Sequence, residues 1–408
     1  MCHKINDTNR LNCNYYGITI YLTSTILLCN FRSMVTPETQ AAEIAKCIDL
    51  DWIGLAFWNT NAGASDGGAK MSGKPTLGTV AKEAGVSIPT VSQVLRGTGR
   101  ISEQTRNRVL EAAKSLHYVP NQTAVAMRSG ENREIGFIIN QLSNPFNAEV
   151  ISGVVDLLEA ESYLVSILDT RDDVGRQSHQ LEAFIRQGRG GLIWVPAIET
   201  PDETFDLLTA HKIPTVTFLR NTRSDIDHVG IRNAEGTATA TRYLMDLGHE
   251  RIAYLGGTDM TLVRRDRIAG YQRVLSESGL GAGVIWDSAD NKLAGLEAML
   301  ELHSSHPEIT AVVCNGDMVA LGACLALQRI GLTPGTEVSV TGFDNIQDAA
   351  VATPPLTTMA VSPHKLGCKL AQVLLDRICD PDKPVTVSEV SAELIIRNTT
   401  RAPLALPQ

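Results

Sequence analysis

From residue 134 onward, short apolar runs alternate with longer stretches whose apolar residues recur every three or four positions. The runs are rich in valine, isoleucine and aromatic residues and end in turn-forming residues, as β-strands do. They cover residues 135–140, 163–169, 190–197, 213–219, 228–231, 251–257, 311–316 and 338–344. Strands alternating with helices predict parallel sheets covered on both faces. Since about 270 residues exceed what one such core usually contains, we expect two α/β lobes with a cleft between them.

Residues 77–95 carry a helical pattern of small apolar residues instead. Thr76 can cap a first helix, and Gly85 can end it in the left-handed conformation that glycine favours. Ser87 can cap a second helix, in which Pro89 falls in the first turn, where its missing N–H costs little. Two short helices joined by a tight turn are a helix-turn-helix.

A third helix is expected from Ser102 to Leu116, with Val109, Ala112 and Ala113 completing a three-helix core. Pro120 then breaks the chain. Asn121 can cap a short helix through Arg128 that has too little apolar surface to be stable alone. This hinge segment would need a partner to fold.

The outer face of the second helix carries hydroxyl groups, an amide and a cation. Hydroxyl groups and a helix N-terminus suit phosphates, and Gln93 can pair with the edge of adenine. Ile88 and Pro89 can contact a thymine methyl group. The alternative is a solvated helical hairpin without a ligand.

Charge sets this module apart from the rest of the chain. The whole sequence of 408 residues has a formal net charge of −9, which argues against a polyanion partner for the molecule as a whole. Residues 74–128 nevertheless contain eight lysines and arginines against three glutamates, a net charge of +5. A nucleic-acid function would therefore reside in this module.

The eight cysteines form neither a disulfide framework nor a metal-binding spacing, so we expect no metal and no cofactor. Cys314, Cys324, Cys368 and Cys379 lie in apolar contexts, where buried, reduced thiols are expected. These features predict a cytoplasmic protein.

Residues 1–73 differ in pattern from the rest of the chain and are expected to be a disordered extension or a mis-assigned start, with translation beginning at Met71. The apolar run at 15–29 is shorter than a membrane-spanning helix. It could serve as the core of a signal peptide, although no small-residue cleavage pattern lies close behind it. An exported solute-binding protein is therefore the alternative class, but such a protein has no use for a basic head.

Motifs of common enzymes are missing. GAKMSGKP approaches a phosphate-binding loop but has Pro75 at the hydroxyl position, and GTGRIS has only two of the three dinucleotide-binding glycines. No G-x-S-x-G nucleophile elbow occurs. We therefore expect no enzyme activity.

The sequence TLGTVAKEAGVSIPTVSQVLRGTGRISEQTRNRVLEAAKSLHYVPNQTAVAMRSG, followed by IGFIINQLSNPF, resembles the LacI/GalR (lactose-repressor) family of bacterial transcriptional regulators. The resemblance runs from about Lys74 to Arg401. It implies a DNA-binding repressor, acting at the bacterial nucleoid as a homodimer on double-stranded operator DNA. The heptad tail of a tetramer has no room after residue 401.

In that family the second helix of the head reads the major groove. The base-reading positions fall on Ile88, Pro89 and Gln93. The phosphate-contacting positions fall on Ser87, Thr90, Ser92, Arg96, Thr105, Tyr118 and Asn121. The resemblance also implies that the hinge folds on DNA and enters the minor groove, where Met127 takes the place of the family's leucine beside Arg128. Gly78 and Thr79 depart from the family pattern and are expected to weaken capping of the first helix.

The two lobes resemble the family's effector-binding core, which is related in fold to periplasmic sugar-binding proteins. The effector positions fall on Phe146, Arg267, Asp317 and, more loosely, Asp290, Asn315 and Asp344. An aromatic face with charged hydrogen-bonding groups suits a sugar. Pentose, hexose, disaccharide and sugar phosphate remain open, a purine fits these residues less well, and Arg267 with Asp317 could instead be a structural ion pair. Induction and co-repression are both compatible with the sequence.

The expected fold class is thus α plus α/β. A helix-turn-helix domain at 74–120 and a hinge helix and linker at 121–132 precede an effector-binding and dimerisation core at 133–408. Lobe 1 is expected at about 133–232 and 338–363, and lobe 2 at about 233–337 and 364–401.

Overall fold

The computed structural model describes residues 74–120, 132–257 and 262–404, together with the backbone of four short N-terminal strands. The chain divides into two compact units, Met1–Tyr118 and Val119–Gln408. Among the helices of these described parts, none is long and apolar enough to cross a membrane. The hinge residues Asn121, Met127 and Arg128 lie outside the described residues.

The N-terminal extension contains an antiparallel sheet that the sequence pattern did not predict. Its strands are β1 (Cys2–Lys4), β2 (Leu11–Tyr15), β3 (Ile18–Thr23) and β4 (Ile26–Asn30), paired in that order. The apolar run at 15–29 is rich in isoleucine, tyrosine and threonine, which favour strands. Most of its residues lie in β3 and β4, and Tyr15 ends β2.

The head consists of α3 (Leu77–Ala84), α4 (Ile88–Leu95) and α5 (Glu103–Ser115). Thr76, Ser87 and Ser102 are the N-caps, and each side chain accepts a hydrogen bond from the backbone N–H three residues later. Gly85 ends α3 at φ +63°. The three helices enclose a small core of Val80, Ala81, Ala84, Val91, Val94, Val109, Ala112 and Ala113.

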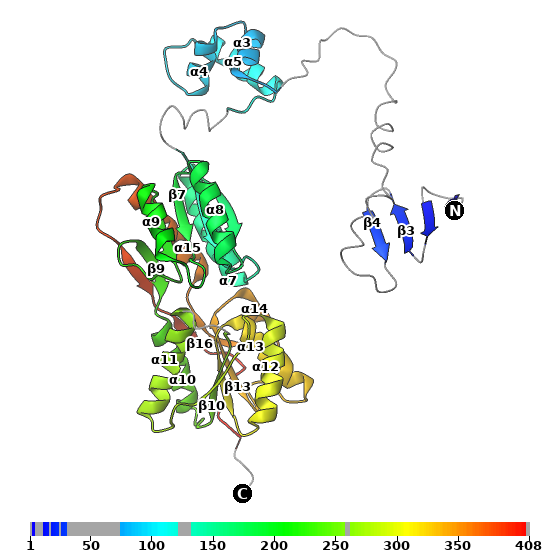
Figure 1. Cartoon of the computed structure of the whole chain (residues 1–408), viewed down its shortest axis with the longest axis vertical. Coiled ribbons are helices and arrows are strands. Elements are labelled where there is room, and N and C mark those ends of the chain that lie inside the picture. The colour runs from blue at the N-terminus through cyan, green and yellow to red at the C-terminus, as the bar shows by residue number, and fades with distance from the viewer. Residues whose placement is uncertain are drawn as a thin grey trace. The chain divides into compact units, whose positions relative to one another are not determined.

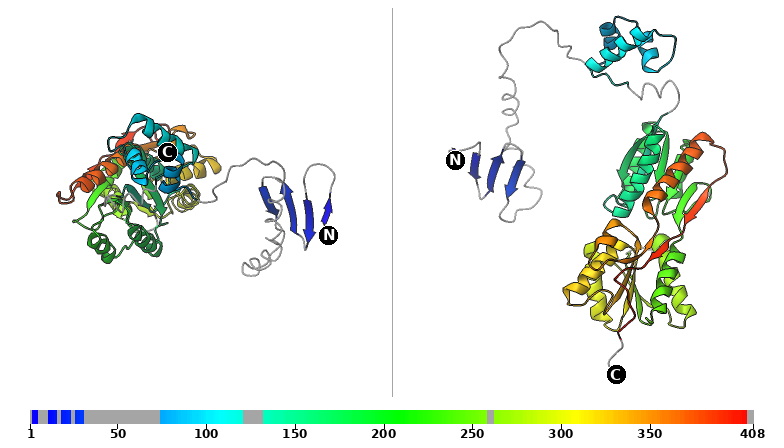
Figure 2. Two further views of the ribbon diagram at one scale, coloured as in Figure 1. Left: turned by 90° about the horizontal axis from the view of Figure 1, so that it is seen from above. Right: turned by 180° about the vertical axis from the view of Figure 1, so that it is seen from behind.

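The second unit has two lobes, each built on a six-stranded sheet with helices on both faces (Figures 1 and 2). The first sheet has the order β15-β9-β8-β7-β5-β6, all parallel. Its strands are β5 (Glu134–Ile139), β6 (Leu164–Asp169), β7 (Gly191–Trp194), β8 (Thr215–Phe218), β9 (Asp227–Ile231) and β15 (Val387–Val390). Its helices are α7 (Pro145–Ala160), α8 (Val174–Arg186), α9 (Asp202–Ala210) and α15 (Pro363–Cys379).

The second sheet has the order β11-β10-β12-β13-β14-β16, with only β16 antiparallel. Its strands are β10 (Ile252–Leu255), β11 (Val284–Trp286), β12 (Ala311–Cys314), β13 (Ser339–Asp344), β14 (Thr357–Ala360) and β16 (Glu393–Ile395). Its helices are α10 (Asn233–Asp246), α11 (Leu262–Glu277), α12 (Lys292–Ser305), α13 (Asp317–Arg329) and α14 (Gln347–Val351).

Successive side chains of β5 pack on opposite faces of the first sheet, and helices cover both faces. Phe137 and Ile139 pack in the cluster that includes Val150 of α7 and Leu370 of α15. Ile138 packs on the opposite side, in the cluster that contains α8 and α9 residues. Because both faces are buried, the strand is a continuous apolar run, as the sequence predicted.

The expected division of the lobes is wrong in its C-terminal part. Residues 338–363 are expected in lobe 1, but β13 and β14 belong to the second sheet. Residues 364–401 are expected in lobe 2, but α15 packs against α7 and β15 pairs with β9, so both belong to the first lobe. The hydrophobic pattern identifies a buried strand but not the sheet that it joins, and the chain crosses between the lobes three times.

Candidate DNA-reading helix and interlobe pocket

Helix α4 begins at a strong capping site. Ser87 accepts from the N–H of Thr90 at 3.4 Å, and the hydroxyl groups of these two residues are 2.9 Å apart. Val91 and Val94 are buried on the inner side of the helix. The opposite side and the N-terminus of α4 are therefore free to meet a ligand, with the positive end of the helix dipole leading.

The three predicted base-reading residues lie together on the exposed side of α4. Ile88 is 51% exposed, which is a large fraction for an isoleucine, and Pro89 and Gln93 are also exposed. The Gln93 side chain lies against Gly99, where an added methyl group would come within 2.9 Å of its Oε1 atom. An amide, a methyl-bearing side chain and a proline ring are thus presented on one face.

The predicted phosphate-contacting residues differ more in exposure. Ser87 and Arg96 are exposed, whereas Thr90, Ser92 and Thr105 are half-buried. Arg96 donates from Nε to the carbonyl of Ser92 at 3.1 Å, which holds its side chain along α4. Tyr118 is half-buried and packs against the core of the head, and Asn121 lies beyond the described residues.

The expectation that Thr79 weakens capping of α3 is wrong. The Thr76 N–H donates to Oγ1 of Thr79 at 2.9 Å, and the Thr79 N–H donates to Oγ1 of Thr76 at 3.2 Å. This is a reciprocal capping box, in which the threonine hydroxyl replaces the usual acidic or amide side chain.

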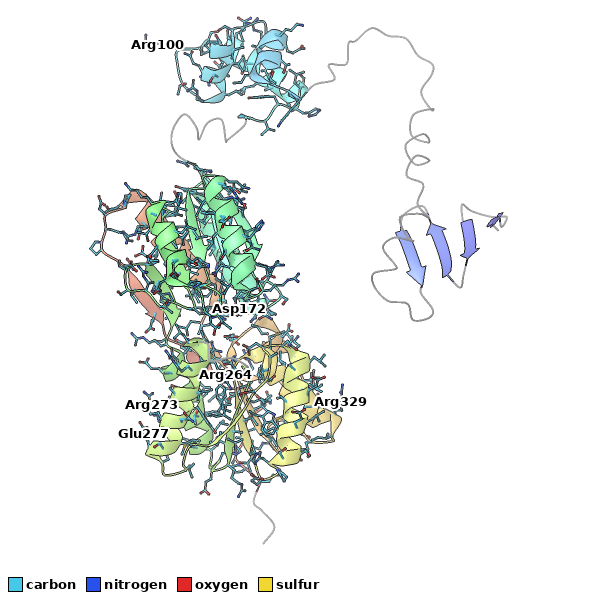
Figure 3. The ribbon with its side chains drawn as sticks, in the orientation of Figure 1. Arg100, Asp172, Arg264, Arg273, Glu277 and Arg329 are labelled. Carbon is cyan, nitrogen blue, oxygen red and sulfur yellow. The ribbon has the colours of Figure 1, made fainter. Side chains whose placement is uncertain are left out.

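The second unit contains a pocket of about 230 Å³ between its lobes. Its walls come from the carboxyl ends of strands in both sheets, where ligands of open α/β sheets bind. Figure 3 labels Asp172 and Arg264, which lie at the adjoining ends of the first and second lobes. Five of the six predicted effector residues line this pocket: Phe146, Arg267, Asp290, Asn315 and Asp344.

Arg267, on α11, is only 5% exposed and is held on several sides. Its guanidinium lies 3.8 Å from the centre of the Phe343 ring, and Nε donates to Oδ1 of Asn233 at 2.8 Å. Nη1 donates to the carbonyl of Asn315, and Nη2 lies 3.5 Å from Oδ1 of Asp344. Its ion pair is thus with Asp344, so the alternative of a structural ion pair with Asp317 is wrong.

Asn315 is fixed by its neighbours. The Tyr254 hydroxyl donates to Oδ1 of Asn315 at 2.7 Å, and Nδ2 of Asn315 donates to Oδ1 of Asp290 at 2.8 Å. Burial raises the pKa of Tyr254, so this hydroxyl stays a donor. The chain of bonds holds the Asp290 carboxylate in place at the pocket wall.

Asp317 does not line the pocket. It is fully buried beneath it, where its carboxylate accepts from Thr358 Oγ1 at 2.5 Å and from the Ile346 N–H at 2.9 Å. Burial raises its pKa well above the usual range, and the nearby Asp344 raises it further. Asp317 thus braces the loop after β13 and has no oxygen directed at a ligand.

The first-lobe wall contains groups that the sequence analysis missed. Arg220 makes a bidentate ion pair with Asp172, at 2.5 Å from Nη1 to Oδ1 and 2.8 Å from Nη2 to Oδ2. Asn140 Oδ1, Asn147 Oδ1 and Arg220 Nε are buried without a hydrogen-bond partner. Because such atoms are costly to leave unpaired, they indicate where a polar ligand would bind.

Phe146 lines the pocket, but the residue is only 3% exposed, and its ring lies 6.3 Å from that of Phe218, centre to centre, in a stacked arrangement. It therefore presents little free face to a sugar. Arg264, near the start of α11, also lines the pocket. It is 5% exposed, pairs with Asp287 and donates from Nε to the Gly256 carbonyl at 3.0 Å.

The strand-end position is the signal that could have found part of the missed set. Asn140 directly follows β5 and Arg220 lies two residues after β8, so both fall at the edge where parallel strands converge. Among the described residues, no group of histidine, cysteine, aspartate or glutamate side chains could hold a metal ion. The pocket can bind a small polar molecule through many hydrogen bonds.

Known protein families match both the head and the two-lobed unit of this chain. The family described as "Bacterial regulatory proteins, lacI family" matches residues 76–121, and the "Periplasmic binding protein-like domain" matches residues 241–400. The transcriptional repressor PurR of Vibrio parahaemolyticus is 32% identical over 330 residues, which cover 80% of this chain and 98% of that protein. The maltose regulon regulatory protein MalI of Escherichia coli is 32% identical over 317 residues, covering 75% of this chain and 93% of its own.

A solved structure of the lac repressor dimer, bound to operator and the anti-inducer ONPF, has a TM-score of 0.73 and 25% identity. It covers 81% of this chain and 100% of the repressor chain. The capped helix-turn-helix, the two-lobed core and these matches over nearly the whole length of the relatives lead to one conclusion. This chain is a member of the LacI family of bacterial transcriptional regulators.

Proposed function

We propose that the protein is a cytoplasmic, nucleoid-associated repressor that binds operator DNA as a homodimer and responds to a small polar effector held between its lobes. The observation that carries the proposal is α4, a capped helix with an exposed reading face in a basic head. The lac repressor of similar fold is a dimer on its operator, and two heads related by two-fold symmetry would fit a pseudo-palindromic site.

In this proposal Gln93 pairs with adenine, while Ile88 and Pro89 contact thymine methyl groups. Ser87, Thr90, Ser92, Arg96, Thr105, Tyr118 and Asn121 bind phosphates and fix the register. Met127 and Arg128 enter the minor groove at the centre of the operator. The seven lysines and arginines against three glutamates in residues 74–120 supply the nonspecific attraction.

The test is selection of binding sites from a random duplex library by the full-length protein, followed by anisotropy titrations on the selected site. Gln93→Ala should cost about 1–3 kcal/mol on that site and relax preference at one position of each half-site. Arg96→Ala should weaken all duplexes alike and reduce the salt dependence. Gln104→Ala, on the exposed start of α5, is the matched control. Failure to select any sequence at low salt would refute DNA reading by this head.

The effector that fits the pocket best is a polyol of monosaccharide size. The pocket's volume of about 230 Å³ lies below the roughly 300–1,000 Å³ of sites for larger ligands. The wall offers unpaired acceptors at Asn140 and Asn147 and a donor at Arg220, along with the carboxylates of Asp290 and Asp344. Hydroxyl groups both donate and accept, so a sugar can satisfy all of them.

A thermal-shift screen of pentoses, hexoses, disaccharides and their phosphates on the full chain tests this assignment, since a bound ligand raises stability by mass action. The sugar that raises Tm should lose its effect in Arg220→Ala. Arg223→Ala is the control, because Arg223 pairs with Asp206 and Asp225 away from the pocket wall. A shift that survives in Arg220→Ala would show that the sugar binds elsewhere. Repeating the operator titrations with the sugar distinguishes induction from co-repression.

A further inference from the structure

Helix α15 carries two cysteines in different environments. Cys314 and Cys324 are buried, as the sequence predicted, but Cys368 is half-buried and Cys379 is exposed. The apolar sequence contexts predicted that all four would be buried. Leu366, Leu370 and Leu374 belong to the buried side of α15, whereas Cys368 and Cys379 lie outside that buried side.

The position of Cys368 results from a close crossing of α15 with α7. A methyl group added to Gly153 would lie 2.0 Å from the carbonyl oxygen of His364, and one added to Gly367 would lie 2.0 Å from that of Val150. Only glycine allows this approach. As a result, the Cys368 thiol donates to the Gly153 carbonyl of the other helix, with Sγ at 3.4 Å from the oxygen.

A histidine and a carboxylate complete the cluster. His364, one turn before Cys368, has Nδ1 at 3.9 Å from Sγ and Nε2 at 2.8 Å from Oδ2 of Asp156 on α7. The His364 and Asp156 side chains are 52% and 67% exposed, so the cluster is open to solvent. Because thiol and carboxylate contact opposite ring nitrogens, the three groups cannot chelate one ion. They are instead arranged as a nucleophile (Cys368), its base (His364) and a carboxylate that orients the base (Asp156).

We propose that Cys368 is a reactive thiol and a site of mixed-disulfide formation with low-molecular-mass disulfides, with His364 as its base and Asp156 as a positioning residue. The Cys368 S–H turns from the Gly153 carbonyl to Nδ1 of His364 and passes its proton to that nitrogen, and Sγ attacks one sulfur of the disulfide. A new S–S bond forms and the old one breaks. The departing half takes the electron pair and then the proton from His364, so Cys368 is oxidised and that half is reduced to a thiol.

The test compares the two thiols of α15 in one molecule. The full-length protein is treated with iodoacetamide, and separately with oxidised glutathione, and modification is followed at each cysteine by peptide mass spectrometry. Cys368 should react about ten-fold faster than Cys379 at pH 7. Its rate should also rise less steeply between pH 6 and 8, because imidazole and not solvent accepts the proton.

Variants show whether the reactivity of Cys368 comes from activation by His364 or only from exposure of the thiol to solvent. His364→Gln, which keeps a hydrogen-bonding side chain but no base, should bring Cys368 down to the rate and the pH profile of Cys379. Asp156→Asn should lie between, and its pH profile should shift, which a purely structural role would not cause. Asp376→Asn, elsewhere on α15, is the control. Equal rates at Cys368 and Cys379 in the unmodified protein, or no effect of His364→Gln on a folded variant, would overturn the proposal.

Discussion

Asp344 combines backbone strain, burial and a single counter-ion. It stands at the end of β13 with φ +110°, a conformation that non-glycine residues rarely adopt, and it is 8% exposed. Burial raises its pKa to about 7, and the negative Asp290 adds to this, against the opposing effect of Arg267. Such strain and pKa perturbation cluster at functional sites, which agrees with the proposed role in effector binding.

The raised pKa of Asp344 predicts that the stability of the folded chain depends on pH. An unfolded aspartate has a pKa of about 3.9, so between that pH and about 7 the folded chain keeps a proton that the unfolded chain has lost. The contribution of Asp344 therefore lowers the free energy of unfolding as the pH rises through this window. Thermal unfolding should show a larger fall in Tm from pH 5 to pH 8 in the natural chain than in Asp344→Asn.

Asparagine suits the test because it keeps the size of the side chain and tolerates positive φ. Asp246→Asn, at the exposed end of α10, is the control and should retain the full fall in Tm. If Asp344→Asn lost as much Tm as the natural chain over the same pH range, Asp344 would not hold a proton in the folded state at pH 5.

For single residues, the sequence predicted where polar side chains lie in the fold better than it predicted which groups they bind. Residues at strand ends could be placed because parallel strands converge there, and this holds for Asn315 and Asp344. The sequence could not predict which of these side chains points into the protein interior and away from the pocket. Asp317 comes three residues after the end of β12 and two residues after Asn315, but its carboxylate accepts hydrogen bonds from Thr358 and from the Ile346 N–H and does not line the pocket. The pair of Asp172 with Arg220 joins residues 48 positions apart, which no local pattern reveals.

At the scale of elements, small residues set the distances between helices. In the head they allow short helices to pack without large side chains, leaving α4 exposed. In the first lobe, Gly153 and Gly367 bring α7 and α15 into direct backbone contact. The caps of all three head helices were predictable because they depend on neighbours in sequence. The α7–α15 crossing was not, because its partners lie more than 200 residues apart.

Two glycine-to-alanine changes should have opposite effects. Gly153→Ala places a methyl group against backbone and should destabilise the core by about 1–3 kcal/mol or more. Gly78→Ala, in α3, meets only ordinary contacts at 3.6 and 3.9 Å and should stabilise the head by about 0.5–1 kcal/mol through helix propensity. Chemical denaturation, followed by separate probes for head and core, measures both. A core that tolerates Gly153→Ala without loss would mean that α15 can move away from α7.

At the scale of the whole molecule, the proposed function requires that two sites in separate units influence each other. In the proposed function the head binds DNA and the pocket binds the effector, and a regulator of this kind needs a coupling free energy between the two sites. A pocket with walls from two lobes suits this role, because a ligand that contacts both lobes favours one lobe arrangement over others. The unpaired atoms Asn140 Oδ1, Asn147 Oδ1 and Arg220 Nε all belong to the first lobe, and the carboxylates of Asp290 and Asp344 belong to the second.

This coupling must be reciprocal. If the effector found in the screen changes the Kd for the selected operator by a given factor, operator must change the Kd for that effector by the same factor. The factor should lie between about 5 and 150, the usual range of such couplings. Anisotropy titrations with and without effector give one value, and calorimetric titrations of effector with and without operator give the other. Gln93→Ala should weaken operator binding yet leave the factor unchanged, because the proposed role of Gln93 is limited to reading a base. An operator that leaves effector affinity unchanged, while effector alters operator affinity, would show that the sugar acts through another equilibrium, such as dissociation of the dimer.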